Sequence, residues 1–462
     1  MSDLYWHPPF NWRRWLIILA GCLILAGLGY FAYSHYFKIP PYTVKPGDSI
    51  QGVLNEMPEG AICYIYPGTY PGALTIPRSG LTLKKTGTGQ VVIDGQGAEN
   101  AVLINNVADT TLENLVIRNS GGSLVALVGQ KAMRNTIHRC TLLEWGLDES
   151  RAYAGAVDSI DGASCTTVDL CYIDRGNHEA VWTQNPEAIS YHFSGGRHTI
   201  TNNIIWGVCR DEDGNPLASQ EDFGDGYPMY KFNIFDVMCG KDGINRLDFD
   251  GTTISGNHLY GAHDDMIGIQ GLDRNCTISH NYIDAMGGAD CIVLRGASIG
   301  PVYITDNIMV NAGMSCFKYS SWKNGAGTAE KYISRNIYYS TLSRTYTRTE
   351  TTWYIPVLNA SYNRFLDGEV NAEDYDNLHV DNNSVYCRSF FLCLKPDSGT
   401  NNTFTNNLFR TDDRSSCIKW FSDNTTISFT TFNNYTGGTN RWETISRPTQ
   451  PTPPDAGAKL SS

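Results

Sequence analysis

A short motif recurs along most of this chain and restricts the folds that the chain can adopt. Thr or Tyr, an apolar residue and two polar residues precede an Asn in TITNN, TISGN, TISHN, YITDN, YISRN and TFTNN. These copies end at Asn203, Asn257, Asn281, Asn307, Asn336 and Asn407, and weaker copies end at Leu115, Cys140, Cys171, Asn233, Asn383 and Thr430. Most successive copies lie 23 to 32 residues apart, which indicates a stack of similar units that contact their neighbours.

The period and the composition together favour a parallel β-helix. A unit near 24 residues is too short for two helices with their turns, and β-branched residues alternating with polar ones are typical of strands. Only 18% of the residues are charged, and Gly and Tyr are plentiful, which favours a β-rich chain with many turns. We therefore expect an all-β solenoid of about 12 coils over residues 44–445, with three short strands in each coil.

The last position of the motif is predicted to lie at one fixed corner of the coil. Stacked Asn side chains there would form an amide ladder at the ~4.8 Å spacing of neighbouring strands. Cys140 and Cys171 fall in the same slot, which gives them a role as small buried ladder residues. Disulfides in an oxidising compartment are the alternative for the cysteines of this chain.

A short helix is predicted at the start of the repeat region. In DSIQGVLNEMP, Asp48 or Ser49 can serve as the N-cap. The apolar residues that follow lie on one helical face: Ile50, Val53, Leu54 and Met57. Such an amphipathic helix can cover the open end of a sheet.

The sequence from this helix through Pro67-Gly68-Thr69-Tyr70 to Ile93-Asp94-Gly95 resembles the opening of pectate-lyase-like right-handed parallel β-helix proteins. The resemblance covers about residues 44–440 and implies a right-handed coil. It implies no single activity, because that superfamily includes lyases, hydrolases, epimerases, phage depolymerases and adhesins.

An apolar segment at residues 15–37 precedes the repeats and is about long enough to cross a bilayer core of ~30 Å. Arg13 and Arg14 precede it, so we expect residues 1–14 in the cytoplasm and the β-helix in the periplasm or extracellular space. A cleaved signal peptide is the alternative, but no small-x-small site follows the apolar run.

Charge and the remaining segments add further limits. The net charge of -12 argues against a nucleic-acid partner, and a polyanionic substrate would need local cations. Residues 210–228 and the long interval between Asn336 and Asn383 are interpreted as loops, of the kind that can wall a binding groove. The Pro-rich tail, 446–462, is predicted to be unstructured.

Carboxylates follow the repeated slot at similar distances in consecutive repeats. Seven to nine residues after each slot lie Asp148, Glu179, Asp211, Asp242, Asp264 with Asp265, and Asp290. This spacing predicts a row of carboxylates along one face. Unit charges 5 Å apart repel by roughly 3 kcal/mol at an effective dielectric of 20, so such a row needs cations, protons or open water.

Three interpretations of the row stay open. One is a Ca²⁺ site with oxygen ligands from Asp242, Asp264, Asp265 and Asp290. The second is a glycosidase-type pair in which one carboxyl stays protonated beside its neighbour. The third is an ordinary solvated turn in which each Asp caps local backbone.

Basic residues near the row could serve in β-elimination, which needs a base for the C5 proton of a uronate and a cation at its carboxylate. The candidates are Lys241, Arg295 and His263, with Lys318 one coil further on. Ordinary surface salt bridges are the alternative for each of them. The arrangement resembles calcium-dependent polysaccharide lyases in outline, but it lacks their downstream Lys and the Asp-Pro-His-Asp sequence of mannuronan epimerases.

The sequence therefore predicts a membrane-anchored extracytoplasmic β-helix that acts on an acidic polysaccharide by calcium-dependent lysis or epimerisation. A non-catalytic β-helix for glycan binding, adhesion or surface assembly is one alternative. A metal-free glycoside hydrolase with paired carboxylates is the other.

Overall fold

The computed structural model describes part of the chain. The described residues are 19–28, 42–148, 153–176, 185–191, 194–207, 218–219, 227–228, 233–238, 251–261, 265–270, 275–286, 290–295, 300–312, 315–320, 330–340, 345–348, 351–354, 356–359, 377–387, 390–394, 401–411, 417–420, 426–427, 439–444 and 449–453. The chain divides into two units, Met1–Thr43 and Val44–Ser462.

In the first unit, residues 19–28 form an α-helix with exposed apolar side chains, including Leu23 and Leu25. Within the described part of the chain, no helix is both long enough and apolar enough to span a membrane. The rest of the predicted span, 15–18 and 29–37, lies outside the described residues.

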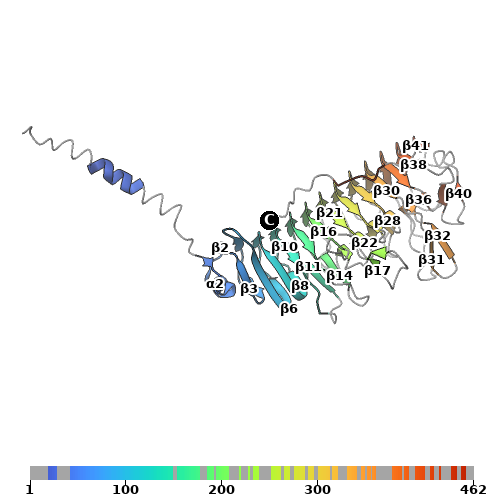
Figure 1. Cartoon of the computed structure of the whole chain (residues 1–462). Coiled ribbons are helices and arrows are strands. Elements are labelled where there is room, and N and C mark those ends of the chain that lie inside the picture. The colour runs from blue at the N-terminus through green and yellow to red at the C-terminus, as the bar shows by residue number, and fades with distance from the viewer. Residues whose placement is uncertain are drawn as a thin grey trace, which may run out of the picture. The chain divides into compact units, whose positions relative to one another are not determined.

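The second unit is a parallel β-helix, as predicted, because strands from successive coils pair in parallel along three faces (Figure 1). Strand β1 (Thr43–Val44) comes before the first full coil. The first face contains β2 (Ile62–Ile65), β5 (Thr82–Lys85), β7 (Thr111–Glu113), β9 (Thr136–His138), β12 (Thr167–Asp169), β15 (Thr199–Thr201), β20 (Thr253–Ser255), β23 (Cys276–Ser279), β26 (Val302–Thr305), β29 (Lys331–Ser334), β34 (Leu378–Asp381) and β37 (Thr403–Thr405).

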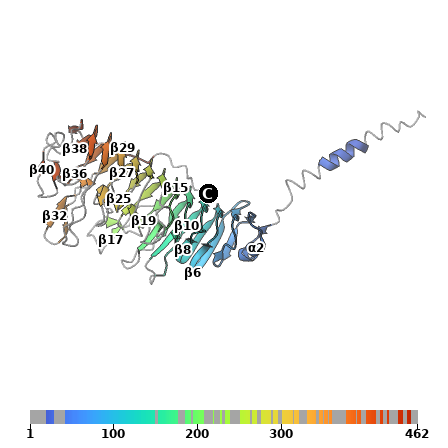
Figure 2. The same cartoon turned by 180° about the vertical axis from the view of Figure 1, so that it is seen from behind.

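The second face follows one corner later in each coil and is seen from the opposite side in Figure 2. It contains β3 (Gly68–Pro71), the starts of β6 (Val91–Asn105) and β8 (Val116–Val128), then β10 (Thr141–Leu143), β13 (Tyr172–Asp174), β16 (Ile204–Trp206), β21 (His258–Tyr260), β24 (Tyr282–Asp284), β27 (Ile308–Val310), β30 (Ile337–Ser340), β35 (Ser384–Cys387), β38 (Leu408–Thr411) and β41 (Arg441–Thr444).

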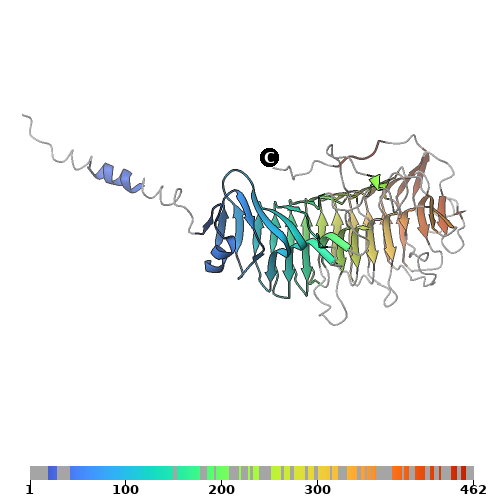
Figure 3. The same cartoon turned by 60° about the horizontal axis from the view of Figure 1, so that its bottom comes forward.

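The third face completes each coil. It contains β4 (Leu74–Thr75), the ends of β6 and β8, then β11 (Tyr153–Ile160), β14 (Asn185–Ser190), β19 (Asn233–Met238), β22 (Asp265–Gln270), β25 (Asp290–Arg295), β28 (Ser315–Ser320), β33 (Pro356–Asn359), β36 (Phe390–Leu394) and β39 (Cys417–Trp420). Figure 3 shows the arrows of successive coils side by side and pointing the same way.

Alternation along the motif produces the core. In β15 the middle residue, Ile200, is fully buried, while Thr199 and Thr201 on either side are half-buried. Ile200 pairs in register with Val168 of β12 and Ile254 of β20, so equivalent apolar residues stack inside the coil. Successive side chains of a strand point to opposite faces, which is why the Thr-Ile-Thr pattern fills the interior with one apolar column.

The corner between the first and second faces has a regular backbone. From Cys140 to Asn407, the residue before each ladder position adopts a positive φ, as at Leu170 (54°), Asn202 (55°) and Asn382 (55°). Gly256 (69°) occupies the same position, where an added Cβ would lie 2.6 Å from the side-chain oxygen of Asn202. A single left-handed residue therefore turns the chain at this corner, which favours Asn and Gly there.

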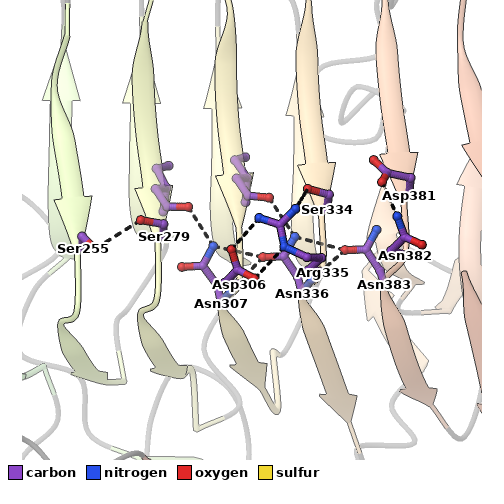
Figure 4. Close-up of polar contacts among 12 residues, drawn as sticks. Ser255, Ser279, Asp306, Asn307, Ser334, Arg335, Asn336, Asp381, Asn382 and Asn383 are labelled. Atoms are coloured by element: carbon purple, nitrogen blue, oxygen red, sulfur yellow. Dashed lines mark hydrogen bonds and ion pairs between the residues drawn. The ribbon is translucent and has the colours of Figure 1, made fainter.

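The predicted amide ladder is confirmed. Asn307 Nδ2 donates to Asn336 Oδ1 at 3.0 Å, and Asn336 Nδ2 donates to Asn383 Oδ1 at 3.1 Å (Figure 4). The same bonds run through Asn203, Asn257, Asn281, Asn307, Asn336, Asn383, Asn407 and Asn440. Each Asn Oδ1 also accepts the backbone N–H of the preceding ladder residue, as Asn336 does from Asn307 at 3.0 Å.

Two predicted ladder positions were wrong. Asn203 bonds directly to Asn257, so Asn233 is no corner residue and instead begins β19 on the third face. Asn440 follows Asn407 in the ladder, so Thr430 is not the last slot. The sequences ending at these two residues resemble the motif, but the chain does not form the ladder corner there.

Two coils are long because segments are inserted between their corners. Asn336 bonds directly to Asn383, which confirms a single coil with a long insertion there. This coil carries an antiparallel pair, β31 (Thr345–Arg348) and β32 (Thr351–Tyr354). The coil between Asn203 and Asn257 carries another, β17 (Ala218–Ser219) and β18 (Tyr227–Pro228), within the predicted loop at 210–228. The short strand β40 (Thr426–Ile427) pairs antiparallel with β39.

The predicted N-terminal helix is present as α2 (Ile50–Glu56). Ser49 is its N-cap, and the Ser49 hydroxyl accepts the Gly52 N–H at 3.1 Å. Ile50, Leu54 and Met57 are buried, which confirms the apolar face of the helix.

Cys140 and Cys171 lie in the ladder column as predicted and are buried. The Cys171 N–H donates to Asn203 Oδ1 at 2.8 Å, so the amide ladder continues into the cysteine positions. The cysteines whose side chains the structure describes are free thiols: Cys22, Cys63, Cys140, Cys165, Cys171, Cys276, Cys291 and Cys316.

Candidate functional site

A column of polar residues stands in the first half of four consecutive strands of the third face. Glu187 of β14 pairs with Asn233 of β19, and Asp265 of β22 pairs with Asp290 of β25. Phe235 pairs with Ile267, so the strands β19 and β22 connect these two pairs in one register. We call Glu187, Asn233, Asp265 and Asp290 the acidic column.

Two carboxylates of the acidic column are withdrawn from solvent. Glu187 and Asp290 each have 0% exposed surface. Neighbouring strands place the Cα atoms of Asp265 and Asp290 roughly 4.8 Å apart. Two carboxylates so close repel unless a cation, a proton or donated hydrogen bonds compensate.

A local pattern positions these residues. In each strand the polar residue is followed by an apolar residue and then by Ile or Phe: Glu187-Ala188-Ile189, Asn233-Ile234-Phe235, Asp265-Met266-Ile267 and Asp290-Cys291-Ile292. Ile189, Ile267 and Ile292 are fully buried. These apolar anchors hold the register, and the polar residue therefore arrives at the same height in every coil.

The structure tests only part of the predicted acidic row. It brings Asp265 and Asp290 together in register, as the row required. Asp242 and Asp264 lie outside the described residues, as do Glu179 and Asp211. For Asp265 the structure describes the backbone, as part of β22.

One member of the predicted row was wrong. Asp148 is exposed, and its N–H donates to Gly121 O at 3.0 Å, away from the third-face strands. The start of β11 supplies Gly155 as the register partner of Glu187. Counting forward from the ladder slot misplaced Asp148 because the segment between second and third strands varies in length.

Glu187 is the residue that counting from the slot missed. It lies 16 residues after Cys171, whereas Asp265 and Asp290 lie eight and nine residues after their slots. The signal that finds Glu187 is its distance from the next apolar anchor, Ile189, since every column residue stands two positions before such an anchor.

The predicted basic residues differ in their distance from the column. Lys241 and His263 lie outside the described residues. Arg295 stands five residues along β25 from Asp290, roughly 16 Å between Cα atoms at ~3.3 Å per residue. Lys318 of β28 pairs with Val293, which places its Cα roughly 11 Å from that of Asp290. On the third-face strands, Lys318 is therefore nearer to the column than Arg295.

Hard oxygen ligands from neighbouring strands are the donor set that Ca²⁺ prefers. Within the part of the chain that the structure describes, no group of three or more His, Cys, Asp or Glu side chains is arranged to hold a metal ion. Asn233 and Asp265 have described backbones only, and Asp242 and Asp264 lie outside the described residues, so the calcium site stays a prediction.

No protein-family model matches the chain, and no curated protein matches it. Solved structures do. The A-module of mannuronan C-5 epimerase AlgE6 from Azotobacter vinelandii is 11% identical, with a TM-score of 0.39, over 85% of this chain and 94% of that chain. A mannuronic acid-specific polysaccharide lyase of family 6 from human gut microbiota is 13% identical, with a TM-score of 0.46, over 88% of this chain and 91% of that chain.

A third similar structure is the GH136 lacto-N-biosidase from Eubacterium ramulus, at 10% identity and a TM-score of 0.46, over 87% of this chain and 68% of that chain. At such identities a likeness concerns the fold alone. The strand pairings described above establish the parallel β-helix independently of these likenesses.

Proposed function

We propose that this protein acts on an acidic polysaccharide at the third face of the β-helix, around Glu187, Asp265 and Asp290. The observation that carries the proposal is the pairing of Asp265 with Asp290 in register, beside a buried Glu187 at the same height two strands earlier. Glu187 and Asp290 stand two positions before buried anchors, and so on the core side of their strands, at the end nearest the corner. Ionisable groups withdrawn from water in this way are frequent at functional sites.

The reaction that we propose is lysis or epimerisation of a uronate polymer, with Ca²⁺ held by Asp265, Asp290 and the predicted ligands Asp242 and Asp264. Bound there, the ion would neutralise the uronate carboxylate and make the C5 proton more acidic. The carboxylates of the chain would hold the ion and fix the sugar ring beside the strand ends. A base must then remove the C5 proton.

The candidates for that base are the residues predicted from the sequence, among them Arg295. The register places the backbones of Arg295 and Lys318 five and three positions along the strands from Asp290, so Cα separation alone does not rank them. Lys241 and His263 stay candidates from the sequence.

The test is activity on a panel of alginate, polygalacturonate and neutral glycans. Lysis is read as unsaturated uronate by ultraviolet absorbance, and epimerisation by the proton spectrum of the product. We expect Asp290→Asn and Asp265→Asn to reduce either activity by about 100-fold or more. The matched control is Asp161→Asn, an exposed turn residue whose positive φ (54°) Asn also tolerates.

The same panel separates the alternatives. Activity on acidic polymers that survives a chelator and yields reducing ends without unsaturation would indicate a hydrolase with paired carboxylates. Saturable binding without product would indicate a glycan-binding protein. Equal activity in Asp290→Asn and Asp161→Asn would exclude the acidic column as the site.

We further propose that residues 15–37 anchor the protein in a membrane, with the β-helix in the periplasm or extracellular space. The apolar composition of the segment and the preceding Arg13 and Arg14 support this. The test is fractionation of the full chain against a variant with Leu19, Leu23 and Leu25 changed to Gln. The full chain should remain with membranes after a high-salt wash, and the variant should not.

A further inference from the structure

A second apolar cluster lies on the outside of the second face. It contains Tyr282, Val310, Tyr339 and Tyr386, with Tyr260 and Ile308 packed against it. These residues alternate with Ile283, Met309 and Tyr338, which are buried inside the coil. Neighbouring residues of a strand point to opposite faces, so this cluster stands on the outer surface. We call it the aromatic strip.

The strip is covered although it faces outward. Val310 has 0% exposed surface, Tyr282 and Tyr339 have 3%, and Tyr386 has 4%. The rings contact one another in two pairs: Tyr339 and Tyr386 are stacked at 5.2 Å between centroids, and Tyr260 and Tyr282 lie 5.9 Å apart. Side chains on the outer face of a sheet reach such values only when other parts of the protein lie over them.

Residues 449–453 of the C-terminal tail lie against the strip. Gln450 is bonded to both adjacent coils: its Oε1 accepts from Asn311 Nδ2 at 3.3 Å, and its Nε2 donates to Asp284 Oδ2 at 3.3 Å. The Tyr282 hydroxyl donates to the backbone carbonyl of Pro451 at 3.4 Å. Gln450 and Pro451 are half-buried, whereas Thr449, Thr452 and Pro453 are exposed.

The chemistry of this contact is that of proline-rich recognition. The tail reads RPTQPTPPD over residues 447–455, and alternating prolines hold such a segment in an extended conformation before it binds. A pre-extended segment loses little entropy on docking, and aromatic rings with hydroxyl donors are the usual partners of its prolines and carbonyls. The tail contains no hydrophobic run, and Gln450 and Pro451 contact the second face through three hydrogen bonds.

We propose that the aromatic strip is a binding site for extended proline-rich segments, and that residues 449–453 of this chain are its resident ligand. Asp284, Asn311 and Tyr282 recognise the Gln-Pro pair through hydrogen bonds. The rings of the strip provide the apolar surface on which the segment lies. The site is on the second face and is independent of the acidic column.

The experiment uses the full, folded chain. A protease recognition sequence is inserted between Thr444 and Arg447, and the tail is released after folding, with circular dichroism confirming that the β-helix persists. A fluorescent peptide of residues 446–462 is then titrated against the cleaved and uncleaved proteins. We expect saturable binding to the cleaved protein and none to the uncleaved one, whose site is filled.

Two matched variants locate the site. Tyr282→Phe removes one hydrogen bond and should weaken peptide binding about fivefold, the equivalent of about 1 kcal/mol. Tyr303→Phe, on the exposed first face, is the control and should leave binding unchanged. A peptide with Gln450→Ala should bind more weakly than the natural one. Equal binding to cleaved and uncleaved protein, or equal loss in the two Tyr variants, would overturn the proposal.

Discussion

Asp265 and Asp290 lie directly opposite each other at the starts of the parallel strands β22 and β25. If Ca²⁺ binds at this pair, as proposed above, the folded state gains stability from the ion because the unfolded chain lacks the site. We expect Ca²⁺ at about 100 times its dissociation constant to raise the free energy of unfolding by ~2.7 kcal/mol. Asp290→Asn should lose most of this gain, measured by thermal melting across a calcium titration. The same shift in Asp161→Asn as in the unmodified protein is the control result, and an undiminished shift in Asp290→Asn would remove the cation site from the column.

The amide ladder predicts a large effect of a single buried substitution. Asn307 accepts the N–H of Asn281 at 3.0 Å, and its Nδ2 donates to Ile278 O at 2.9 Å. Asn307→Leu would leave these backbone groups buried without partners, each at a cost of about 1 to 3 kcal/mol. We therefore expect a loss of about 3 kcal/mol or more in urea unfolding. Asn105→Ala, on an exposed strand end, should change stability by less than about 0.5 kcal/mol.

The left-handed corner predicts a stabilising substitution. Leu170 holds φ at 54°, whereas Asn202, Asn382 and Asn406 occupy the same corner in other coils. A left-handed conformation costs a residue such as Leu roughly 1 to 2 kcal/mol, and Asn less. Leu170→Asn should thus raise the unfolding free energy by about 1 kcal/mol. Leu170→Val, which is β-branched, should lower it, and the two variants together test the conformational cause.

Buried His198 predicts acid sensitivity of the fold. Its Nδ1 accepts the Thr166 N–H at 3.3 Å, so Nε2 carries the proton and donates to Ser194 Oγ at 3.1 Å. Burial lowers the pKa of His198 from 6.5 to about 3. Below pH 6.5 the unfolded chain therefore takes up a proton that the folded chain refuses, and stability falls as the pH decreases towards 3.

His198→Asn should remove this slope while keeping the acceptor. Asn135 shows that Asn fits an equivalent position, since its Oδ1 accepts the Thr110 N–H at 2.8 Å. The measurement is the difference in unfolding free energy between variant and unmodified protein from pH 7 to pH 4. A difference that does not change with pH would contradict the assignment.

Asp284 predicts the opposite pH dependence. Burial raises the pKa of its carboxyl from 3.8 to about 6, against hydrogen bonds from the Met286 N–H and the Gln450 amide. The folded state thus holds a proton between pH 4 and 6 that the unfolded state has lost, and the contribution is lost as the pH rises through 6. Asp284→Asn should be more stable than the unmodified protein at pH 7, by on the order of 3 kcal/mol, and should gain nothing at pH 4. Unfolding titrations at both pH values decide between this and a pH-independent effect.

The repeat was predictable because each coil must place the same residue types at the same corner. The ladder from Asn257 through Asn336 to Asn407 follows from the letters of the motif, since a buried amide there has no other satisfactory partner. The false slot Asn233 lies in the 54-residue coil between Asn203 and Asn257, where the spacing no longer constrains the register. The false slot Thr430 lies in the coil between Asn407 and Asn440, and there the motif letters alone could not identify the corner.

The candidate site was predictable only in part. Asp265 and Asp290 were found together because short, equal connections separate them from their ladder residues. Glu187 was missed because eight additional residues separate it from its slot, so counting from the corner did not reach it. Its distance from the apolar anchor Ile189 is the same as in the other strands of the column. The contacts of Gln450 with Asp284 and of Pro451 with Tyr282 join residues 166 and 169 positions apart. No sequence pattern around Gln450 and Pro451 indicates these partners.

The direct bonds from Asn203 to Asn257 and from Asn336 to Asn383 span 54 and 47 residues without any change in their geometry. The coils on either side of such an insertion therefore pair as they would without it. Segments inserted between the second and third strands of a coil can be lengthened or exchanged while the Asn ladder keeps its geometry. Specificity for a new polymer could thus be acquired by altering the inserted segments alone, with no need to rebuild the scaffold.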